Sequence, residues 1–112
     1  MPHAELKYSS ELELDAPAIL ARIEAVIQSH DAGSGECKGR AYPSALTHHR
    51  HVLVQIALLP KAHRDGAFMS ALLNDLKTAI SAMLPDDIFF SLGLEFSSPH
   101  YVTGPIKEVR NA

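Results

Sequence analysis

The first residues of the chain could carry base chemistry. Pro2 follows Met1, and a small residue in that position usually allows the processing machinery to remove the methionine. Removal would leave Pro2 with a free secondary amine, whereas an internal proline nitrogen is a non-basic amide. An α-amino group has a pKa of about 7.7–8.0, near the working pH that a general base requires. Proline is common enough in sequences that Pro2 alone does not establish this chemistry.

A second group of residues with possible chemistry is the histidine cluster His48, His49 and His51. Histidine often binds metals, but adjacent side chains of an extended segment diverge, and no cysteine or carboxylate stands at ligand spacing. We interpret the cluster as an exposed turn, with metal binding as the alternative. Cys37 has no basic partner nearby in the sequence and is interpreted as a small, buried residue rather than a nucleophile.

The composition predicts one small domain over residues 1–112. The chain has 112 residues, of which 46% are hydrophobic, so it can form a single core. Its net charge of −3 gives no general attraction to nucleic acid. No apolar stretch is long enough to cross a membrane. With a single cysteine and no secretory signal, we expect a cytoplasmic protein without an internal disulfide.

Two strand–helix units would position the amino terminus. Residues 2–8 alternate between apolar and polar side chains, which is typical of a half-buried strand. Apolar residues at helical spacing predict a helix over Ala16–His30 with Asp15 as its N-cap. A short strand within 37–46 is expected to be interrupted or ended by Pro43.

The second half of the chain repeats this order. The nearly continuous apolar run 52–59 predicts a central strand covered on both faces. Asp65 is placed to cap a second helix with a wide apolar stripe. The alternating run 88–96 predicts a last strand, in which Gly93 indicates a bulge or a close approach by another chain. The tail 97–112 has no core of its own and either frays or lies across a neighbouring subunit.

The order strand, helix, strand, strand, helix, strand predicts an α+β fold. Each half should be a right-handed unit with two parallel strands. Two such halves give one four-stranded mixed sheet with both helices on one face. The run 52–59 also requires a cover on the other face, and the chain has no third helix to provide it. Self-association is the simplest cover, since closed symmetric assemblies are common.

These residues resemble a known family. Met1-Pro2-His3 at the start of a strand and a helix beginning Asp15-Ala-Pro17-Ala-Ile-Leu-Ala-Arg22 are similar to the 5-carboxymethyl-2-hydroxymuconate Δ-isomerases. These are a branch of the tautomerase superfamily, whose members work with an amino-terminal proline. The resemblance continues through Cys37-Lys-Gly-Arg40-Ala-Tyr, the strand 52–59, the loop with Arg64, the second helix and Leu92-Gly-Leu-Glu-Phe96.

The resemblance implies a homotrimer of βαββαβ subunits that acts on a small carboxylic acid in the breakdown of aromatic compounds. It implies an isomerase without metal or cofactor that moves a double bond in an unsaturated keto or enol acid. By this analogy Pro2 is the general acid/base, and Arg40 helps to polarise the carbonyl. Lys38 and Arg64 would bind substrate carboxylates, and His3 is a further candidate for substrate binding. Neither nucleic acid nor a membrane is an expected partner.

The basic residues also have a physical role that does not depend on the family. Burial and nearby cations lower the pKa of an amine, and Lys38, Arg40 and Arg64 could supply the cations. The same cations could hold a carboxylate and stabilise a developing dienolate oxygen. Lys38 stands where the family commonly has arginine, and an ammonium lacks the two-pronged grip of a guanidinium. The alternative is a non-catalytic trimeric protein that binds small acids, particularly if Met1 is retained and Pro2 nitrogen stays an amide.

Overall fold

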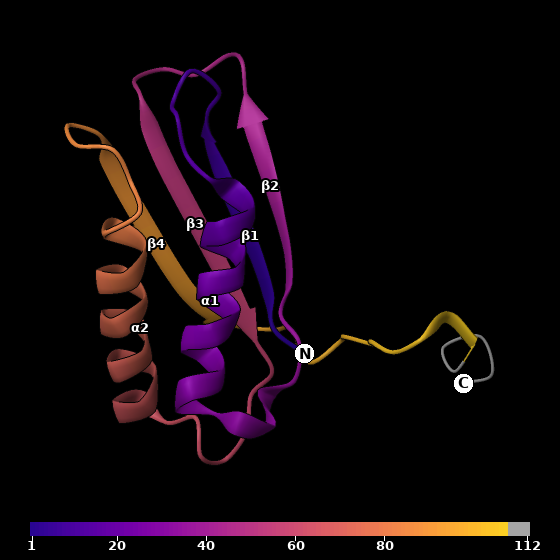
Figure 1. The fold of residues 1–112 in the computed structure, drawn as a ribbon. Helices are drawn as coiled ribbons and strands as arrows, with labels where there is room; N and C mark the ends of the chain where they lie inside the picture. The colour runs from indigo at the N-terminus through magenta and orange to yellow at the C-terminus, as the bar shows by residue number, and fades with distance from the viewer. Residues whose placement is uncertain (108–112) are drawn as a thin grey trace.

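A computed structural model describes residues 1–107 of the chain (Figure 1). Its elements are β1 (His3–Ser9), α1 (Ala16–His30), a short 3-10 helix η1 (Ala32–Ser34), β2 (Lys38–Ser44), β3 (His51–Leu58), α2 (Gly66–Ser81) and β4 (Phe89–Phe96). The predicted βαββαβ order is confirmed. The last part of the predicted tail, 108–112, lies outside the described residues.

The four strands form one mixed sheet in the order β2-β1-β3-β4. Each strand–helix–strand unit contributes one parallel pair, β1 with β2 and β3 with β4, as predicted. The two units meet where β1 and β3 pair in antiparallel orientation. Figure 1 shows α1 and α2 side by side on the same face of this sheet, and the predicted α+β arrangement is therefore confirmed.

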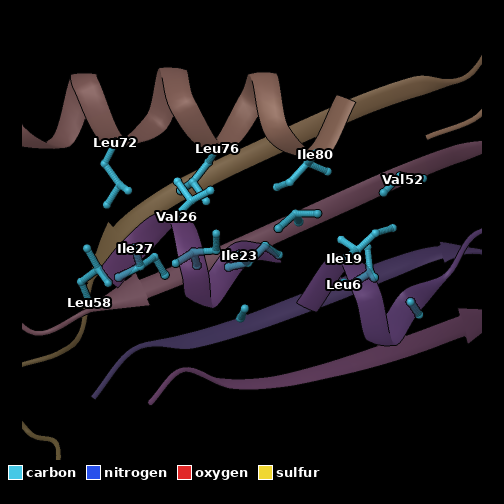
Figure 2. Close-up of a cluster of buried hydrophobic side chains, with 14 of the residues drawn as sticks. Leu6, Ile19, Ile23, Val26, Ile27, Val52, Leu58, Leu72, Leu76 and Ile80 are labelled. Atoms are coloured by element: carbon cyan, nitrogen blue, oxygen red, sulfur yellow. The ribbon is translucent and has the colours of Figure 1, made fainter. Parts of the chain in front are cut away.

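The hydrophobic core lies between the two helices and one face of the sheet (Figure 2). The apolar stripes of both helices face alternate residues of the two central strands, because side chains of a strand point to opposite faces in turn. The fully buried members are Ala4, Leu6, Ile19, Ile23, Val54, Ile56, Leu58, Leu72, Leu76 and Ile80.

Both helices begin at the residues that the sequence predicts. The Asp15 carboxylate accepts a hydrogen bond from the Ala18 N–H at 3.1 Å, and the Asp65 carboxylate accepts one from the Phe68 N–H at 2.8 Å. These bonds satisfy amide groups that a helix start leaves without a partner. Within residues 1–107, no helix has the length and apolar character that crossing a membrane would require.

The prediction for Pro43 is wrong, and so is one of the two alternatives for Gly93. Pro43 neither ends nor interrupts β2, but pairs with Tyr8 in an unbroken register. A proline is tolerated there because β2 is an edge strand, which uses hydrogen bonds on one side only. Gly93 forms no bulge, since β3 and β4 pair without interruption on either side of it. Its possible approach by another chain stays a prediction.

One face of the sheet has no cover among residues 1–107. In β3, Val52 and Val54 are buried beneath the helices, whereas Leu53 is only half-buried and Gln55 is exposed. The expectation that the run 52–59 is covered on both faces is therefore not met by a single subunit. We call this uncovered side the outer face. It carries His3 and, by register, its β2 partner Lys38 and its β3 partner Ala57.

Candidate active site

The amino terminus is fixed at the start of the inner strand β1. The Pro2 side chain is fully buried. The Pro2 carbonyl oxygen accepts a hydrogen bond from the Lys38 N–H at 2.9 Å, which extends the pairing of β1 and β2 beyond the strand itself. The nitrogen of Pro2 is thus held in one place by the sheet, as a base must be if it is to meet a substrate in a defined geometry.

A chain of hydrogen bonds lies directly beside Pro2. Arg40 Nη2 is 2.8 Å from His3 Nδ1, and His3 Nε2 is 2.9 Å from the hydroxyl oxygen of Tyr101. Arginine can only donate, so His3 Nδ1 must accept, and the ring carries its proton on Nε2. His3 is therefore neutral in this arrangement. Burial first, and then the Arg40 charge, lower the pKa of His3, which favours the same state.

The outer face is hollowed next to this chain of hydrogen bonds. The hollow has a volume of about 340 Å³, and we call it the N-terminal hollow. It is lined by His3, Glu5, Arg40, Gln55, Ala57, Glu95 and Tyr101. Arg40 is the cation among these side chains and Glu5 and Glu95 are carboxylates, so an anionic ligand would be drawn toward the Arg40 side.

The electrostatic surroundings of the chain start favour a neutral amine. The pKa of the Met1 amino group is lowered, first by burial and then by the charges of Lys61 and Arg64. Sequence reasoning missed Lys61. The Arg64 N–H donates to the Lys61 carbonyl at 2.9 Å, so both residues belong to the same turn after β3. The sequence indicates this only by placing Lys61 and Arg64 three residues apart in the same loop.

Arg64 is bound within the protein rather than open to a ligand. Its side chain is 2% exposed. The Nε and Nη2 atoms donate to Asp31 Oδ2 at 3.1 and 2.8 Å, and Nη1 donates to the Leu59 carbonyl at 2.7 Å. The structure therefore brings Arg64 near the amino terminus as a charge, but places its donors on Asp31 and Leu59 and outside the lining of the N-terminal hollow.

Lys38 lies at the edge of the sheet with an exposed side chain. Its ammonium is 2.6 Å from a Glu36 carboxylate oxygen, and this hydrogen bond raises the pKa of Lys38. As the β2 partner of His3, Lys38 lies on the outer face but does not line the N-terminal hollow. Of the five residues proposed from the sequence, the structure joins His3 and Arg40 by a side-chain hydrogen bond next to Pro2.

The fold of the chain is also that of known proteins. No protein-family model matches the sequence, and no curated protein matches it. A 5-carboxymethyl-2-hydroxymuconate delta-isomerase structure matches with a TM-score of 0.68 and 15% identity, over 100% of this chain and 93% of that one. A 5-carboxymethyl-2-hydroxymuconate isomerase from Deinococcus radiodurans R1 matches with a TM-score of 0.59 and 19% identity, over 99% and 94%.

A fused 4-OT, itself a symmetric trimer, matches with a TM-score of 0.60 and 11% identity, over 91% of this chain and 93% of that one. The chain has the tautomerase fold. The resemblance in the sequence is thereby confirmed as a likeness of fold, which is what identities of this size establish.

In this tautomerase fold, Tyr101 is a site residue that sequence reasoning missed. It lies in the segment after β4, which Figure 1 shows passing the amino terminus before it extends away from the body. Its ring packs edge-on against His3, with centroids 6.0 Å apart, and its hydroxyl lies 3.4 Å from the Met1 carbonyl oxygen. The tail therefore does not simply fray, because this part of it contacts its own subunit. In the sequence, Tyr101 differs from the rest of the tail 97–112 only in being its one tyrosine, which is a weak indication of a site residue.

The histidine cluster lies at the opposite end of the sheet from Pro2. His49 has a left-handed backbone with φ of 68°, and His48 and His49 lie in the exposed turn that the sequence predicts, whereas His51 is the half-buried first residue of β3. Across residues 1–107, no three histidine, cysteine or acidic side chains lie close enough to share a metal ion.

Cys37 is partly buried just before β2. Burial first, and then the charge of Glu24, raise the pKa of its thiol to about 11. At neutral pH the side chain is thus almost entirely in the thiol form, which is the unreactive one.

Proposed function

We propose that this chain is a cofactor-free tautomerase. It moves a proton between the enol and keto, or conjugated and unconjugated, forms of an unsaturated 2-hydroxy or 2-oxo carboxylic acid. An acid similar to 5-carboxymethyl-2-hydroxymuconate is the proposed substrate. The observation that carries the proposal is the amino terminus, which is fixed at the sheet and surrounded by charges that favour a neutral amine. The tautomerase fold supports it, since isomerases of that acid share the fold.

In the proposed reaction, Pro2 acts as a secondary amine after Met1 is removed. The neutral nitrogen takes a proton from a carbon next to the substrate carbonyl, and the electron pair of the broken C–H bond moves to the oxygen. The same nitrogen then returns the proton to another carbon of the conjugated system. Burial, and then the charges of Lys61 and Arg64, lower the pKa of the Met1 amino group, and we propose that they keep the Pro2 amine neutral in the same way.

Arg40 is the proposed cation for the developing negative charge. It is half-buried and lines the N-terminal hollow, where a charge acts more strongly than in open water. Lys38, which is exposed at the start of β2, is proposed to bind a substrate carboxylate by displacing Glu36. Arg64 is proposed to act on substrate through its charge, since its N–H groups are engaged by Asp31.

We further propose that three copies of the chain associate through the outer face. Tyr42 and Phe89 are 41% and 75% exposed, and Leu46 is 91% exposed. Burial of such side chains stabilises association by roughly 25 cal/mol per Å² of apolar area. The native mass in solution tests this assembly. Three times the subunit mass is expected, and a monomer over the working concentration range would contradict it.

The test of the proposed function is an ultraviolet enol–keto assay on protein whose intact mass shows the loss of Met1. Processed protein should convert 2-hydroxymuconate or phenylpyruvate-type enols, and Pro2→Ala should lose this activity. Pro43→Ala is the matched control, since it removes another proline of the same sheet and should leave the rate unchanged. Failure to convert any of these acids would reject the proposal.

The alternative is a non-catalytic protein that binds small acids on the same scaffold. The observation that favours it is the full burial of Pro2, whose nitrogen is an amide for as long as Met1 is attached. It predicts retained Met1 in the cell, no tautomerisation, and equal binding of small acids by the parent and Pro2→Ala. Weaker binding by Pro2→Ala would count against it.

A further inference from the structure

We propose that the Tyr101 hydroxyl donates a hydrogen bond to the carbonyl oxygen of the substrate while Pro2 moves the proton. This inference rests on the proposed function of the amino terminus. It adds Tyr101, which lies in the segment after β4, to the proposed basic residues of β2 and of the loop after β3. His3 and Arg40 then act on the reaction in part by orienting this hydroxyl.

The Met1 carbonyl serves as an internal stand-in for the substrate carbonyl. Its carbon is bonded to Pro2 nitrogen, and its oxygen accepts a hydrogen bond from the Tyr101 hydroxyl at 3.4 Å. When Met1 is removed, this acceptor leaves and the hydroxyl faces the space beside the new amine. A substrate carbonyl in that space lies next to the base and the donor at once. A free ligand can also approach the hydroxyl more closely than the peptide group does, since such bonds are ordinarily 2.7–2.8 Å long.

The direction of the Tyr101 proton is set by its neighbours. Arg40 donates to His3 Nδ1, so His3 Nε2–H donates to the Tyr101 oxygen. The tyrosine oxygen is thus an acceptor toward His3, and its own proton is left for a second acceptor on the side of Met1. The two rings also pack edge-on, with an interplanar angle of 83°, and this contact limits the movement of the Tyr101 ring relative to His3. A hydrogen-bond donor that already points toward the substrate oxygen needs little reorganisation when negative charge develops on that oxygen.

The proposed step is balanced without any further reactant. The C–H bond of the substrate breaks, an N–H bond forms on Pro2, and the electron pair moves onto the carbonyl oxygen. Tyr101 keeps its proton throughout and only strengthens its hydrogen bond as that oxygen becomes negative. Return of the proton from Pro2 to a second carbon restores the enzyme. Arg40 contributes its charge through the same network.

The experiment compares Tyr101→Phe with Tyr42→Phe in processed protein. Both variants lose one hydroxyl from a partly exposed ring, and Tyr42 lies elsewhere on the outer face, where its hydroxyl donates to Glu5 at 3.3 Å. We expect Tyr101→Phe to lower kcat by about 100-fold with little change in KM, as when one donor to a developing oxyanion is removed. Tyr42→Phe should keep the parental kcat, and both should melt at the parental temperature.

The outcomes separate this inference from the proposed function. If the parent is active and Pro2→Ala is not, but Tyr101→Phe matches the parent, Tyr101 has no such role and the tautomerase proposal stands. If the processed parent converts none of the acids, both proposals fail. A rise in KM at constant kcat would also overturn the inference, because it would show that Tyr101 binds substrate and transition state equally.

His3 is tested as a positioning residue by two substitutions. Glutamine can accept from Arg40 through its carbonyl and donate to Tyr101 through its amide, whereas alanine can do neither. His3→Gln should therefore retain more of the parental kcat than His3→Ala. Equal rates for the two variants would show that the orientation of Tyr101 does not depend on this side chain.

Discussion

Arg40 and Arg64 both lie near the amino terminus, yet their surroundings differ. Arg64 is buried, and each of its three donor nitrogens has a partner on Asp31 or Leu59. Arg40 is half-buried, lines the N-terminal hollow, and makes its described side-chain contact with His3. The same residue type thus holds the fold together in one place and faces a hollow in the other.

This difference shows how the role of an arginine can be inferred from its burial and its partners before any ligand is known. A buried guanidinium whose donors are satisfied has little left to offer a substrate, but its charge still acts on groups nearby. A half-buried guanidinium with unused donors can bind an anion without first breaking a bond in the protein. Resemblance alone gives both residues the same role, whereas burial and partners separate them.

The largest effect should follow when Arg64 loses its partner. Asp31→Ala leaves a buried guanidinium without its carboxylate, which typically costs about 3–5 kcal/mol of unfolding free energy. Urea denaturation of the parent and the variant measures this. Glu36→Ala is the control, because it breaks the exposed ion pair with Lys38 and should cost far less than Asp31→Ala. Equal costs for the two variants would show that Arg64 is not a structural clamp.

Substitution of Arg40 should show the opposite pattern. Arg40→Ala should lower kcat/KM by about 100-fold, because it removes both a cation at the hollow and the bond that orients His3. Its unfolding free energy should change by less than about 1 kcal/mol, since a half-exposed pair contributes little. A rate near that of the parent, or a loss of stability as large as that of Asp31→Ala, would contradict the comparison.

Acid should weaken the Arg64 region by protonating Asp31. Hydrogen bonds from His63 and Arg64 lower the pKa of Asp31 to about 2, from an ordinary value of 3.8. Because the folded value is the lower one, this stabilisation is complete above about pH 4 and is lost as the pH falls toward about 2. It amounts to roughly 1–2 kcal/mol, allowing for screening of the half-exposed His63.

Denaturation of the parent and Asp31→Asn between pH 5 and pH 2 checks this dependence. Over this interval the variant should lose less stability than the parent, since it has no carboxyl group to protonate at this position. Parallel curves would mean that Asp31 does not carry the acid sensitivity.

The smallest effect is expected at Lys38. Its ammonium is exposed and already paired with Glu36, so Lys38→Ala should leave the unfolding free energy at the parental value. The KM for a dicarboxylic acid should rise a few-fold, while the KM for a monocarboxylic acid such as phenylpyruvate stays constant. An equal change for both acids would show that Lys38 does not contact a second carboxylate.

The elements of this fold were predictable because their signals are local. Asp15 and Asp65 cap helices through amides three residues away, and the helix and strand periodicities each lie within one segment. Pro43 was misjudged because only the order of strands shows that β2 lies at the sheet edge.

The side-chain partners of the site were not predictable in the same way. Asp31 and Arg64 are 33 residues apart, and His3 and Tyr101 are 98 apart, so neither pairing leaves a local pattern. The resemblance to tautomerases led sequence reasoning to Pro2, His3 and Arg40, and the structure joins His3 to Arg40 because β1 and β2 pair in register. It could not see that Arg64 was already bound or that Tyr101 returns to the amino terminus.

The most direct test of the central claim is a ¹⁵N NMR titration of the Pro2 nitrogen in processed protein labelled at proline. Pro2 is then the only proline with an amine, so its signal is the one that shifts with pH. The account predicts a lower pKa in the folded protein than in the same protein unfolded in urea, because burial, Lys61 and Arg64 disfavour the charged amine. A folded value equal to or above the unfolded one would contradict it.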